Sequence, residues 1–292
     1  MDAKVVVAKA TKVVAPAKAG AQFSKTRVPA FAGTTIHRAV VVFLLFFVSA
    51  VCVAQTQTEK APFVPRSGQD GKDVVWVPTP DALVEKMLDM AKVTPQDYVI
   101  DLGSGDGRTV IAAARRGARA LGVEYNPDMV ELSKQAAAKA GVADKASFVK
   151  ADLFKTDLSK ATVITMFLLT DINLKLRPRL LGLRPGTRIV SNTFKMGDWE
   201  PDETATLYAN EGCKNTYCTA HLWIIPARVS GVHKVADGEL RLQQDFQRLS
   251  GFLHTEGKAF AVKGKVTGDE VAFTANGKEY RGKAKGKSLE LN

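Results

Sequence analysis

Cysteine and histidine are scarce in this chain, and their scarcity restricts the metal sites that it can build. The 292 residues include three cysteines and four histidines. Cys213 and Cys218 form a C-x4-C pair, but no second cluster of cysteine or histidine lies nearby, so we expect no metal site. The pair is compatible with a disulfide in an oxidising compartment, and equally with two reduced thiols in a loop.

Basic charge is also missing from the middle of the chain. The net charge is +11, but residues 1–58 hold about +6 of it and residues 231–292 about +3, which leaves about +2 for residues 59–230. A nucleic-acid-binding domain needs basic residues concentrated on its own surface. We therefore expect no specific nucleic-acid partner.

No apolar run reaches the roughly 20 residues that a membrane-spanning helix needs. The longest, residues 39–54, has 16 uncharged residues and follows a basic tail at 1–38 whose composition predicts disorder. Its length is nearer to the apolar core of a signal peptide, and small residues at Cys52 and Ala54 fit a cleavage site. We expect an exported protein, with an uncleaved membrane anchor as the alternative, and a linker at residues 55–72.

The main domain, predicted at residues 73–228, is organised around a short glycine-rich stretch. The apolar run Val99-Ile-Asp-Leu102 is followed by glycines at 103, 105 and 107, and a helical pattern begins at Thr109. This order predicts a buried strand, a tight loop and a helix, the first half of a βαβ unit. Glycine permits positive φ and the close approach of a ligand to the main chain. The stretch therefore predicts a nucleotide-type ligand.

Further apolar runs follow at the spacing of strands that alternate with helices. They cover residues 119–124, 146–151, 162–169 and 188–194, and a pair of hairpin strands is predicted near 203–210 and 219–226. Strands with intervening helices predict an open, doubly wound α/β sheet, whose ligands bind at the carboxyl ends of the strands.

Two carboxylates follow later strands at positions suited to a nucleoside. Glu124 lies 17 residues after Gly107, at the end of the second strand, where it can accept both hydroxyls of a ribose. Asp152 lies just past the third strand, where it can accept a hydrogen bond from an exocyclic amine such as that of adenine. Capping of the following segment is the alternative for Asp152.

The spacing of the glycines distinguishes two classes of nucleotide. A dinucleotide fingerprint is G-x-G-x-x-G, whereas this loop is G-x-G-x-G with Arg108 in the position of the third fingerprint glycine. Asp101 precedes the glycines and suits a ligand with a positive amino group. This favours the methionine part of S-adenosylmethionine.

These motifs resemble those of the class I, seven-β-strand methyltransferases. Val77-Pro-Thr-Pro80, Asp101–Arg108, the run at 162–170 and Arg188-Ile-Val-Ser191 resemble one branch, which contains non-SET histone lysine methyltransferases and mitochondrial lysine methyltransferases that act on the ATP synthase c-ring protein and the adenine nucleotide translocase. The resemblance covers about residues 73–228. It implies a Rossmann-like seven-stranded sheet with an antiparallel last strand.

The resemblance also implies roles for individual residues. Glu124 would hold the ribose and Asp152 the adenine, while the methionine end would be held by the acidic residue and the loop after it: Asp101, Gly103, Ser104, Gly105 and Gly107. Thr79 belongs to an extended segment at 76–80. This segment either crosses the ligand site or packs against the helix that follows it.

The methyl acceptor is predicted from the same branch to be a protein lysine. Phe167-Leu-Leu-Thr170 lacks the Asn/Asp-Pro-Pro-Tyr signature of many amine and base methylases. A lysine amine must lose its proton, and an apolar channel would lower its pKa. Leu168, Leu169, Phe194 and Trp199 are candidates for such a channel, and Asp171, Asn192 and Asp198 are candidate catalytic residues that receive the proton or orient the amine.

Residues 229–292 show six short alternating runs separated by turn signals, which predict a small C-terminal antiparallel β sheet or barrel. We expect it to cap the main domain, or to dock a substrate or membrane surface. The function predicted for the whole chain is S-adenosylmethionine-dependent methylation of protein lysine. RNA or small-molecule methylation and a non-catalytic exported binding protein stay open, as does the oligomeric state, and an exported enzyme would be separated from its cytosolic cofactor.

Overall fold

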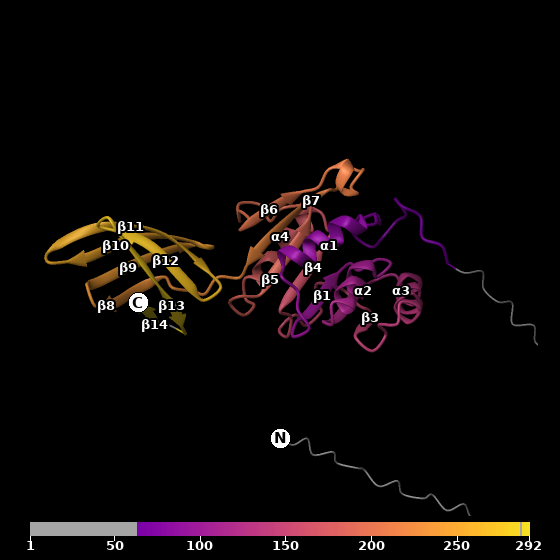
Figure 1. Cartoon of the computed structure of the whole chain (residues 1–292), viewed down its shortest axis with the longest axis horizontal. Helices are drawn as coiled ribbons and strands as arrows, with labels where there is room; N and C mark the ends of the chain where they lie inside the picture. Colours follow the sequence, from indigo (N-terminus) through magenta and orange to yellow (C-terminus); the bar gives the residue numbers. More distant parts are fainter. Residues whose placement is uncertain (1–62, 287) are drawn as a thin grey trace, which may run out of the picture. The chain divides into compact units, whose positions relative to one another are not determined.

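The computed structural model describes residues 63–286 and 288–292 (Figure 1). The predicted basic tail, the apolar segment at 39–54 and residues 55–62 of the predicted linker lie outside these residues. Within the described part of the chain, we find no helix whose length and hydropathy would let it cross a membrane.

The main domain contains one sheet of seven strands in the order β3-β2-β1-β4-β5-β7-β6. Strands β1 to β5 pair in parallel, whereas β7 runs antiparallel to both β5 and β6. This confirms the predicted doubly wound sheet with its antiparallel end. The strands are β1 (Tyr98–Leu102), β2 (Arg119–Glu124), β3 (Ala146–Lys150), β4 (Val163–Met166), β5 (Arg188–Asn192), β6 (Glu203–Thr206) and β7 (Thr219–Ile224).

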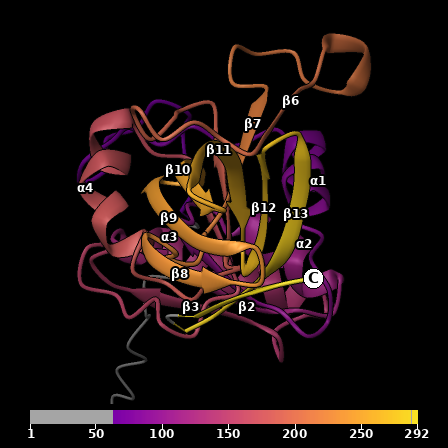
Figure 2. The same ribbon diagram turned by 90° about the vertical axis from the view of Figure 1, so that its left-hand side faces the viewer.

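Helices cover both faces of this sheet because successive strand residues point to opposite sides. Val99 packs in a core with α1 (Asp81–Met90), α2 (Arg108–Arg115) and α3 (Pro127–Lys139). Ile100 packs in a second core with α4 (Thr170–Leu180). Figure 2 shows α4 on one side of the sheet and α1 and α2 on the other. The carboxyl ends of the parallel strands therefore form an edge that lies between two helical layers.

Two strands end earlier than the sequence predicts, and both early ends place loop residues at the carboxyl edge of the sheet. β4 ends at Met166, so that Phe167 to Leu169 form a loop before α4. β5 ends at Asn192 because Thr193 has φ +61°, which an extended strand cannot accommodate. Residues that were predicted to lie within strands are thus released into connections beside the ligand edge.

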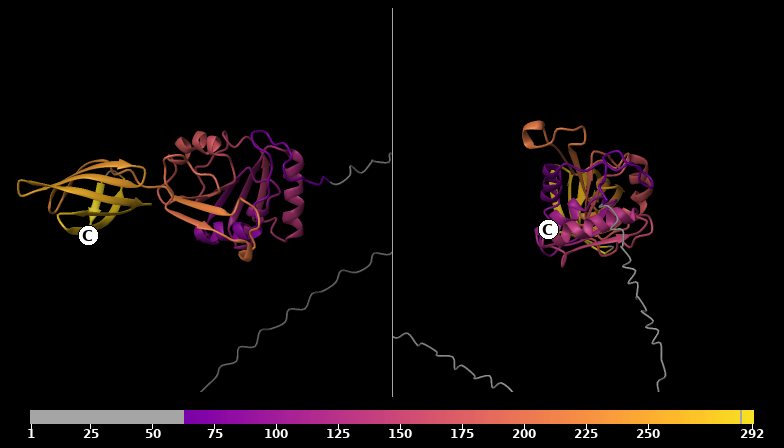
Figure 3. Two further views of the ribbon diagram at one scale, coloured as in Figure 1. Left: turned by 90° about the horizontal axis from the view of Figure 1, so that it is seen from above. Right: turned by 90° about the vertical axis from the view of Figure 1, so that its right-hand side faces the viewer.

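The C-terminal residues form a second, seven-stranded antiparallel sheet in the order β14 to β8 (Figure 3). β14 approaches β8, so the sheet curls towards a barrel. Six of its strands follow the predicted runs, but β8 was missed because the one buried side chain in it is His233 and not an apolar residue. The strands are β8 (Gly231–Val235), β9 (Gly238–Asp245), β10 (Arg248–Thr255), β11 (Lys258–Thr267), β12 (Glu270–Ala275), β13 (Lys278–Lys285) and β14 (Ser288–Leu291).

Trp199 connects the two sheets. Its ring stacks on Phe246 with centroids 5.7 Å apart, and its Nε1 donates a 2.9 Å hydrogen bond to Oε1 of Gln247. The Trp223 indole in turn donates to the Trp199 carbonyl at 2.8 Å. Trp199 is fully buried in this junction. It therefore does not line the acceptor channel for which the sequence made it a candidate.

Candidate functional site

A cavity of about 180 Å³ lies at the carboxyl ends of the parallel strands. The connections after β1 to β5 line it, together with residues 69–79 from the segment before α1. Seven of the predicted cofactor-binding residues line this cavity: Thr79, Asp101, Gly103, Ser104, Gly105, Glu124 and Asp152. The structure thus brings these residues together, while the role of each towards a ligand stays a prediction.

Gly105 and Gly107 cannot carry a side chain for two different structural reasons. Gly105 has φ +54°, and a Cβ there would lie 2.4 Å from Nε1 of Trp76, whose indole covers the main chain of the loop. Gly107 has φ +80°, and its Cβ would lie 2.7 Å from the ring of Phe148 and 2.8 Å from Ser133. Gly105 thus lets the Trp76 indole lie directly against the main chain of the loop. Gly107 does not line the cavity and permits close packing between the loop and its neighbours.

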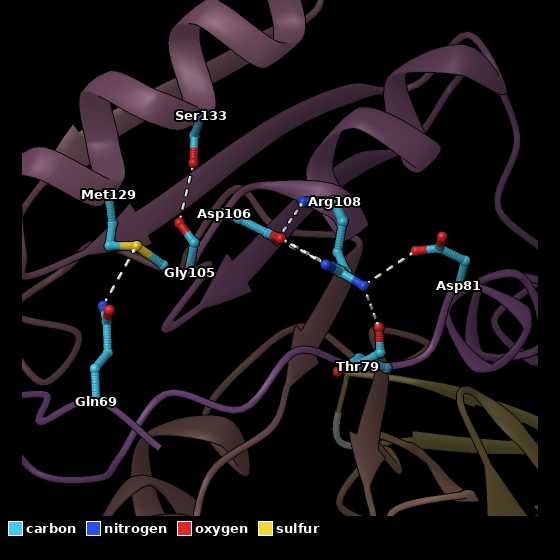
Figure 4. Close-up of polar contacts among 8 residues, drawn as sticks. All are labelled: Gln69, Thr79, Asp81, Gly105, Asp106, Arg108, Met129 and Ser133. Carbon is cyan, nitrogen blue, oxygen red and sulfur yellow. Dashed lines mark hydrogen bonds and ion pairs between the residues drawn. The ribbon is translucent and has the colours of Figure 1, made fainter. Parts of the chain in front are cut away.

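Arg108, which also lines the cavity, fixes the glycine loop through contacts with three residues. Its guanidinium bonds the Asp106 carboxylate at 2.6 Å, the Thr79 carbonyl at 2.9 Å and the Asp81 carboxylate at 3.2 Å (Figure 4). Ser133 donates a 3.0 Å hydrogen bond to the Gly105 carbonyl (Figure 4). The residue that replaces a third fingerprint glycine therefore ties the loop to the extended segment that contains Thr79.

Glu124 supports the loop as well as facing the cavity. Its Oε2 accepts a 2.9 Å hydrogen bond from the Gly105 amide, and its Oε1 accepts from the amides of Tyr125 at 2.8 Å and Asn126 at 2.9 Å. A carboxylate has about four acceptor positions. Glu124 therefore retains capacity for a ligand hydroxyl while it holds the glycine loop in place.

Asp101 is a buried carboxyl at the centre of the site. Burial raises its pKa to about 7, and the negative charges of Asp106 and Glu124 act in the same direction. The Thr165 hydroxyl opposes this shift by donating a hydrogen bond of 2.6 Å. A cationic group of a ligand beside Asp101 would stabilise its ionised form.

Ser104 has a buried hydroxyl whose oxygen finds no hydrogen-bond partner among the described residues. A buried polar atom without a partner costs free energy. Ser104 and Asp101 both line the cavity, but the Ser104 oxygen itself lies beside Gly122, where an added Cβ would approach it to 2.6 Å.

Asp152 is engaged by a residue that the sequence assigned to the linker. Lys72 Nζ lies 3.0 Å from its Oδ2 and 4.9 Å from the ring centroid of Tyr125. The Lys72 ammonium and the Phe154 amide lower the pKa of Asp152 through hydrogen bonds. Lys72 thus bonds the carboxylate that was predicted to accept from the adenine amine.

The segment that carries Lys72, residues 66–79, lies over the cavity. Main-chain hydrogen bonds join Gly68 to Trp76 at 2.8 Å and Trp76 to Gln69 at 2.9 Å. The Gln69 amide contacts Met129 on α3 at 3.7 Å (Figure 4). At the other end, Asn192 donates to the Thr79 hydroxyl at 3.3 Å. We call residues 66–79 the covering segment.

The candidate catalytic residues lie outside the cavity lining. Asn192 is fully buried and bonds Thr79, Asp198 is ion-paired with Arg177, and Asp171 is exposed in the first turn of α4. The Arg177 side chain lowers the pKa of Asp198 by hydrogen bonding. Asn192 thus contacts the predicted cofactor residue Thr79, whereas Asp171 and Asp198 lie apart from the cavity lining, and the catalytic role of all three stays a prediction.

Aromatic rings line the cavity on the side of β4, β5 and β7. The ring of Phe167 lies 6.1 Å from that of Phe194 and 5.2 Å from that of Tyr217, measured between centroids. Leu168, Leu169 and Phe194 line the cavity as expected for a channel. Phe167 was not predicted as a lining residue, although it lies in the apolar run at 162–170. Tyr217 was not predicted because it lies in a loop without any periodic pattern.

Tyr217 belongs to a loop closed by a disulfide between Cys213 and Cys218. Of the two alternatives for this cysteine pair, a disulfide or two reduced thiols, the structure therefore contains the disulfide. Among residues 63–286 and 288–292, no group of three or more histidine, cysteine, aspartate or glutamate side chains has the arrangement of a metal site.

Comparisons with known proteins identify the family. Residues 101–203 match the family described as the ANTKMT methyltransferase domain. A protein-lysine N-methyltransferase of Saccharolobus islandicus is 43% identical over 164 residues, which are 55% of this chain and 96% of that protein. The chain belongs to the class I S-adenosylmethionine-dependent methyltransferases. This confirms the predicted enzyme class and its cofactor.

The methyltransferase also matches longer proteins in part. An adenine nucleotide translocase lysine N-methyltransferase of Mus musculus is 36% identical over 120 residues, 40% of this chain and 52% of that protein. The chain thus spans about half the length of this relative. A crystal structure of an RNA methyltransferase from Salinibacter ruber with S-adenosyl-L-homocysteine is 48% identical and covers 52% of this chain and 96% of that chain, with a TM-score of 0.48.

The cavity of the methyltransferase fits S-adenosylmethionine in its own chemistry. The cofactor has a positive amino group, and Asp101 is a buried carboxyl whose ionised form a cation would stabilise. Glu124 retains acceptor capacity for the ribose.

Proposed function

We propose that this enzyme transfers the methyl group to the side-chain nitrogen of a protein lysine. The similarity to lysine N-methyltransferases supports this acceptor. The observation that carries the proposal is the division of the cavity lining. Polar groups come from the ends of β1 to β3 and from the covering segment, whereas the lining from the ends of β4, β5 and β7 is apolar or aromatic, namely Met166, Phe167, Leu168, Leu169, Ile172, Phe194 and Tyr217.

An apolar lining suits a long alkylamine in two ways. It buries the methylene groups of the lysine side chain, and it disfavours the ammonium form, which lowers the pKa of the amine towards the neutral nucleophile. When bound, S-adenosylmethionine supplies a methyl group that is already activated on a sulfonium. The chain's residues then have to hold the amine in line with it and exclude water.

Methyl transfer to the wrong class of acceptor would refute this proposal. The full chain is incubated with S-adenosylmethionine carrying a labelled methyl group and with lysate separated into protein, RNA and small-molecule fractions. We expect label in protein, with mass spectrometry placing it on lysine. Label confined to RNA or to small molecules would overturn the assignment of lysine.

We further propose that the enzyme acts outside the cytosol, exported or anchored through residues 39–54. The apolar run at these residues and the Cys213–Cys218 disulfide support an oxidising compartment. Cell fractionation with N-terminal sequencing tests this. We expect an exported protein that begins at Gln55, or an intact membrane-bound chain if the segment is an anchor. An intact chain in the cytosolic fraction would refute it.

A further inference from the structure

We propose that His221 is a positioning residue for methyl transfer: it holds a strained turn at Thr193, and this turn fixes Phe194 in the apolar lining of the cavity and Asn192 on Thr79. The proposal rests on the proposed function and deepens it, because it names what keeps the apolar end of the cavity in place. Neither His221 nor Thr193 lines the cavity, so both act through their neighbours.

The main chain after β5 is strained at Thr193. Its φ of +61° belongs to the left-handed region, and of the five non-glycine residues with positive φ in the described part of the chain it alone is β-branched. A β-branched side chain crowds the main chain there, which costs free energy. The Phe194 amide donates a 2.7 Å hydrogen bond to the Asn192 carbonyl two residues back, which closes a three-residue turn of the γ type.

This turn determines where two neighbouring side chains lie. Before it, the fully buried Asn192 donates to the Thr79 hydroxyl at 3.3 Å, and its Oδ1 accepts from the Thr193 hydroxyl at 2.8 Å. After it, Phe194 lines the cavity and packs against Phe167, with ring centroids 6.1 Å apart. One strained residue thus connects a predicted cofactor residue with the apolar lining.

His221 binds the turn from β7. Its Nε2 lies 3.2 Å from the Thr193 carbonyl oxygen, and its Nδ1 lies 2.9 Å from the Thr204 hydroxyl on β6. A carbonyl oxygen only accepts, so Nε2 carries a proton, and in the neutral ring Nδ1 then accepts from Thr204. Burial lowers the pKa of His221, which favours this neutral form. Thr204 thus orients the ring that holds the turn.

Side chains from β5 and α4 hold the next carbonyl of the turn. The Phe194 carbonyl accepts from the Ser191 hydroxyl at 2.7 Å and from the Asn173 amide at 3.1 Å. Ser191, Asn173 and His221 are all buried. Two consecutive carbonyls are therefore bound by buried side chains from three elements, which is the support that a strained turn needs in order to persist.

Methyl transfer depends on such support because the reaction is sensitive to alignment. The acceptor nitrogen has to approach the sulfonium methyl group in line, and a misplacement of about 1 Å lowers the rate by as much as about 100-fold. Without the hydrogen bond from His221, the strained turn would relax towards an ordinary φ. Phe194 and Asn192 would move with it, and the wall beside the acceptor would lose its place.

The reach of the side chain at position 221 tests this role on the full chain. His221→Gln keeps an amide donor at the place of Nε2, whereas asparagine is one methylene shorter and does not reach the Thr193 carbonyl. Transfer of a labelled methyl group from saturating S-adenosylmethionine to the protein fraction of a lysate should fall about tenfold or more in His221→Asn and clearly less in His221→Gln. The affinity for S-adenosyl-L-homocysteine, measured by calorimetry, should stay within about twofold of wild type in both.

His233→Asn is the matched control. His233 lies in the C-terminal sheet, is also buried, and has its Nε2 2.8 Å from the Val229 carbonyl oxygen. The control variant loses a bond of the same kind away from the cavity, so its rate of label transfer should equal that of wild type. Thermal unfolding confirms that each variant is folded, and His221→Phe replaces His221→Asn if the smaller residue unfolds the protein. Equal loss of rate in His221→Asn and His221→Gln, or in His221→Asn and His233→Asn, would overturn the proposal.

The strain at Thr193 gives a second readout. Asparagine adopts positive φ more readily than threonine, so Thr193→Asn should keep the turn with less help from His221. In that background His221→Asn should slow label transfer no more than about twofold. A full loss of rate there would also overturn the proposal. Label that wild type transfers only to RNA or to small molecules would instead refute the proposed function, and the same variants are then compared on that acceptor.

Discussion

The hydroxyl of Thr165 on β4 donates a 2.6 Å hydrogen bond to the carboxyl group of Asp101, its register partner on β1. This bond lies in the centre of the parallel sheet, below the glycine loop. It only partly offsets the burial of Asp101, whose pKa is raised from 3.8 to about 7. The site therefore holds a carboxyl that exchanges its proton near neutral pH.

Asp101→Asn should change how stability depends on pH. Between pH 3.8 and 7 the folded protein keeps a proton on Asp101 that the unfolded chain has lost, so the contribution of Asp101 to stability falls as pH rises through this range. Relative to Asp101→Asn, the free energy of unfolding of the ligand-free wild type should fall from pH 5 to pH 7.5, measured by urea denaturation.

The titration of His221 changes the free energy of unfolding with pH in the opposite direction, but His221 is present in both the wild type and Asp101→Asn. Burial lowers its pKa from 6.5, so it favours folding more as pH rises towards that value. The difference between wild type and Asp101→Asn cancels this effect. Parallel stability curves for the two proteins would contradict the raised pKa of Asp101.

Lys72→Ala should strengthen cofactor binding. Lys72 holds Asp152 through an exposed ion pair at 3.0 Å and so competes with the adenine amine for this carboxylate. Exposed ion pairs are weak, so we expect the affinity for S-adenosyl-L-homocysteine to rise only a few-fold, by calorimetry. Lys139→Ala, in the last turn of α3, is the control. A weaker affinity for Lys72→Ala would mean that Lys72 itself contacts the ligand.

Gly107→Ala should destabilise the protein more than Gly141→Ala. Both glycines have positive φ, +80° and +70°, so the left-handed backbone destabilises each alanine variant by about 1 kcal/mol. A Cβ at Gly107 also meets Phe148 and Ser133 below 3 Å, whereas one at Gly141 meets nothing within 4 Å. Overpacking adds about 1–3 kcal/mol at Gly107. Urea denaturation measures both, and equal losses would contradict the packing role of Gly107.

Gln247→Ala should weaken the junction between the two sheets. Gln247 accepts from the buried Trp199 indole at 2.9 Å and donates to the Glu200 carbonyl at 2.7 Å. Leaving the indole N–H unpaired should cost about 1–3 kcal/mol of unfolding free energy. The loss should be smaller in a Trp199→Phe background, which has no N–H to satisfy. Additive losses in the double variant would contradict the coupling.

The part of the site that follows local sequence patterns was predictable. The strand, glycine loop and helix at residues 98–115 are marked by adjacent residues, and Glu124 at the end of β2 is marked by its spacing from them. Such patterns fix the loop and the ends of parallel strands, which the topology then brings to one edge. The expected cofactor residues therefore meet at one cavity, apart from Gly107.

The residues that cover and close the site were not predictable from such patterns. Lys72 meets Asp152 across 80 positions, from a segment whose composition is that of a linker. Tyr217 reaches Phe167 through a disulfide-closed loop without periodicity. The carboxylate at Asp198 had the right chemistry for a base, but its partner Arg177 lies 21 positions away and turns it into an ion pair. These contacts depend on tertiary structure alone.

Calorimetric titration of the full chain with S-adenosyl-L-homocysteine tests most directly that the cavity at the glycine loop is the cofactor site. Wild type should bind one equivalent. Glu124→Gln should bind roughly tenfold more weakly or worse, because it loses a charged acceptor that also holds Gly105, whereas the surface control Glu131→Gln should bind normally. Thermal unfolding confirms that each variant is folded. Equal affinity in folded Glu124→Gln and wild type, or no binding by wild type, would contradict this account.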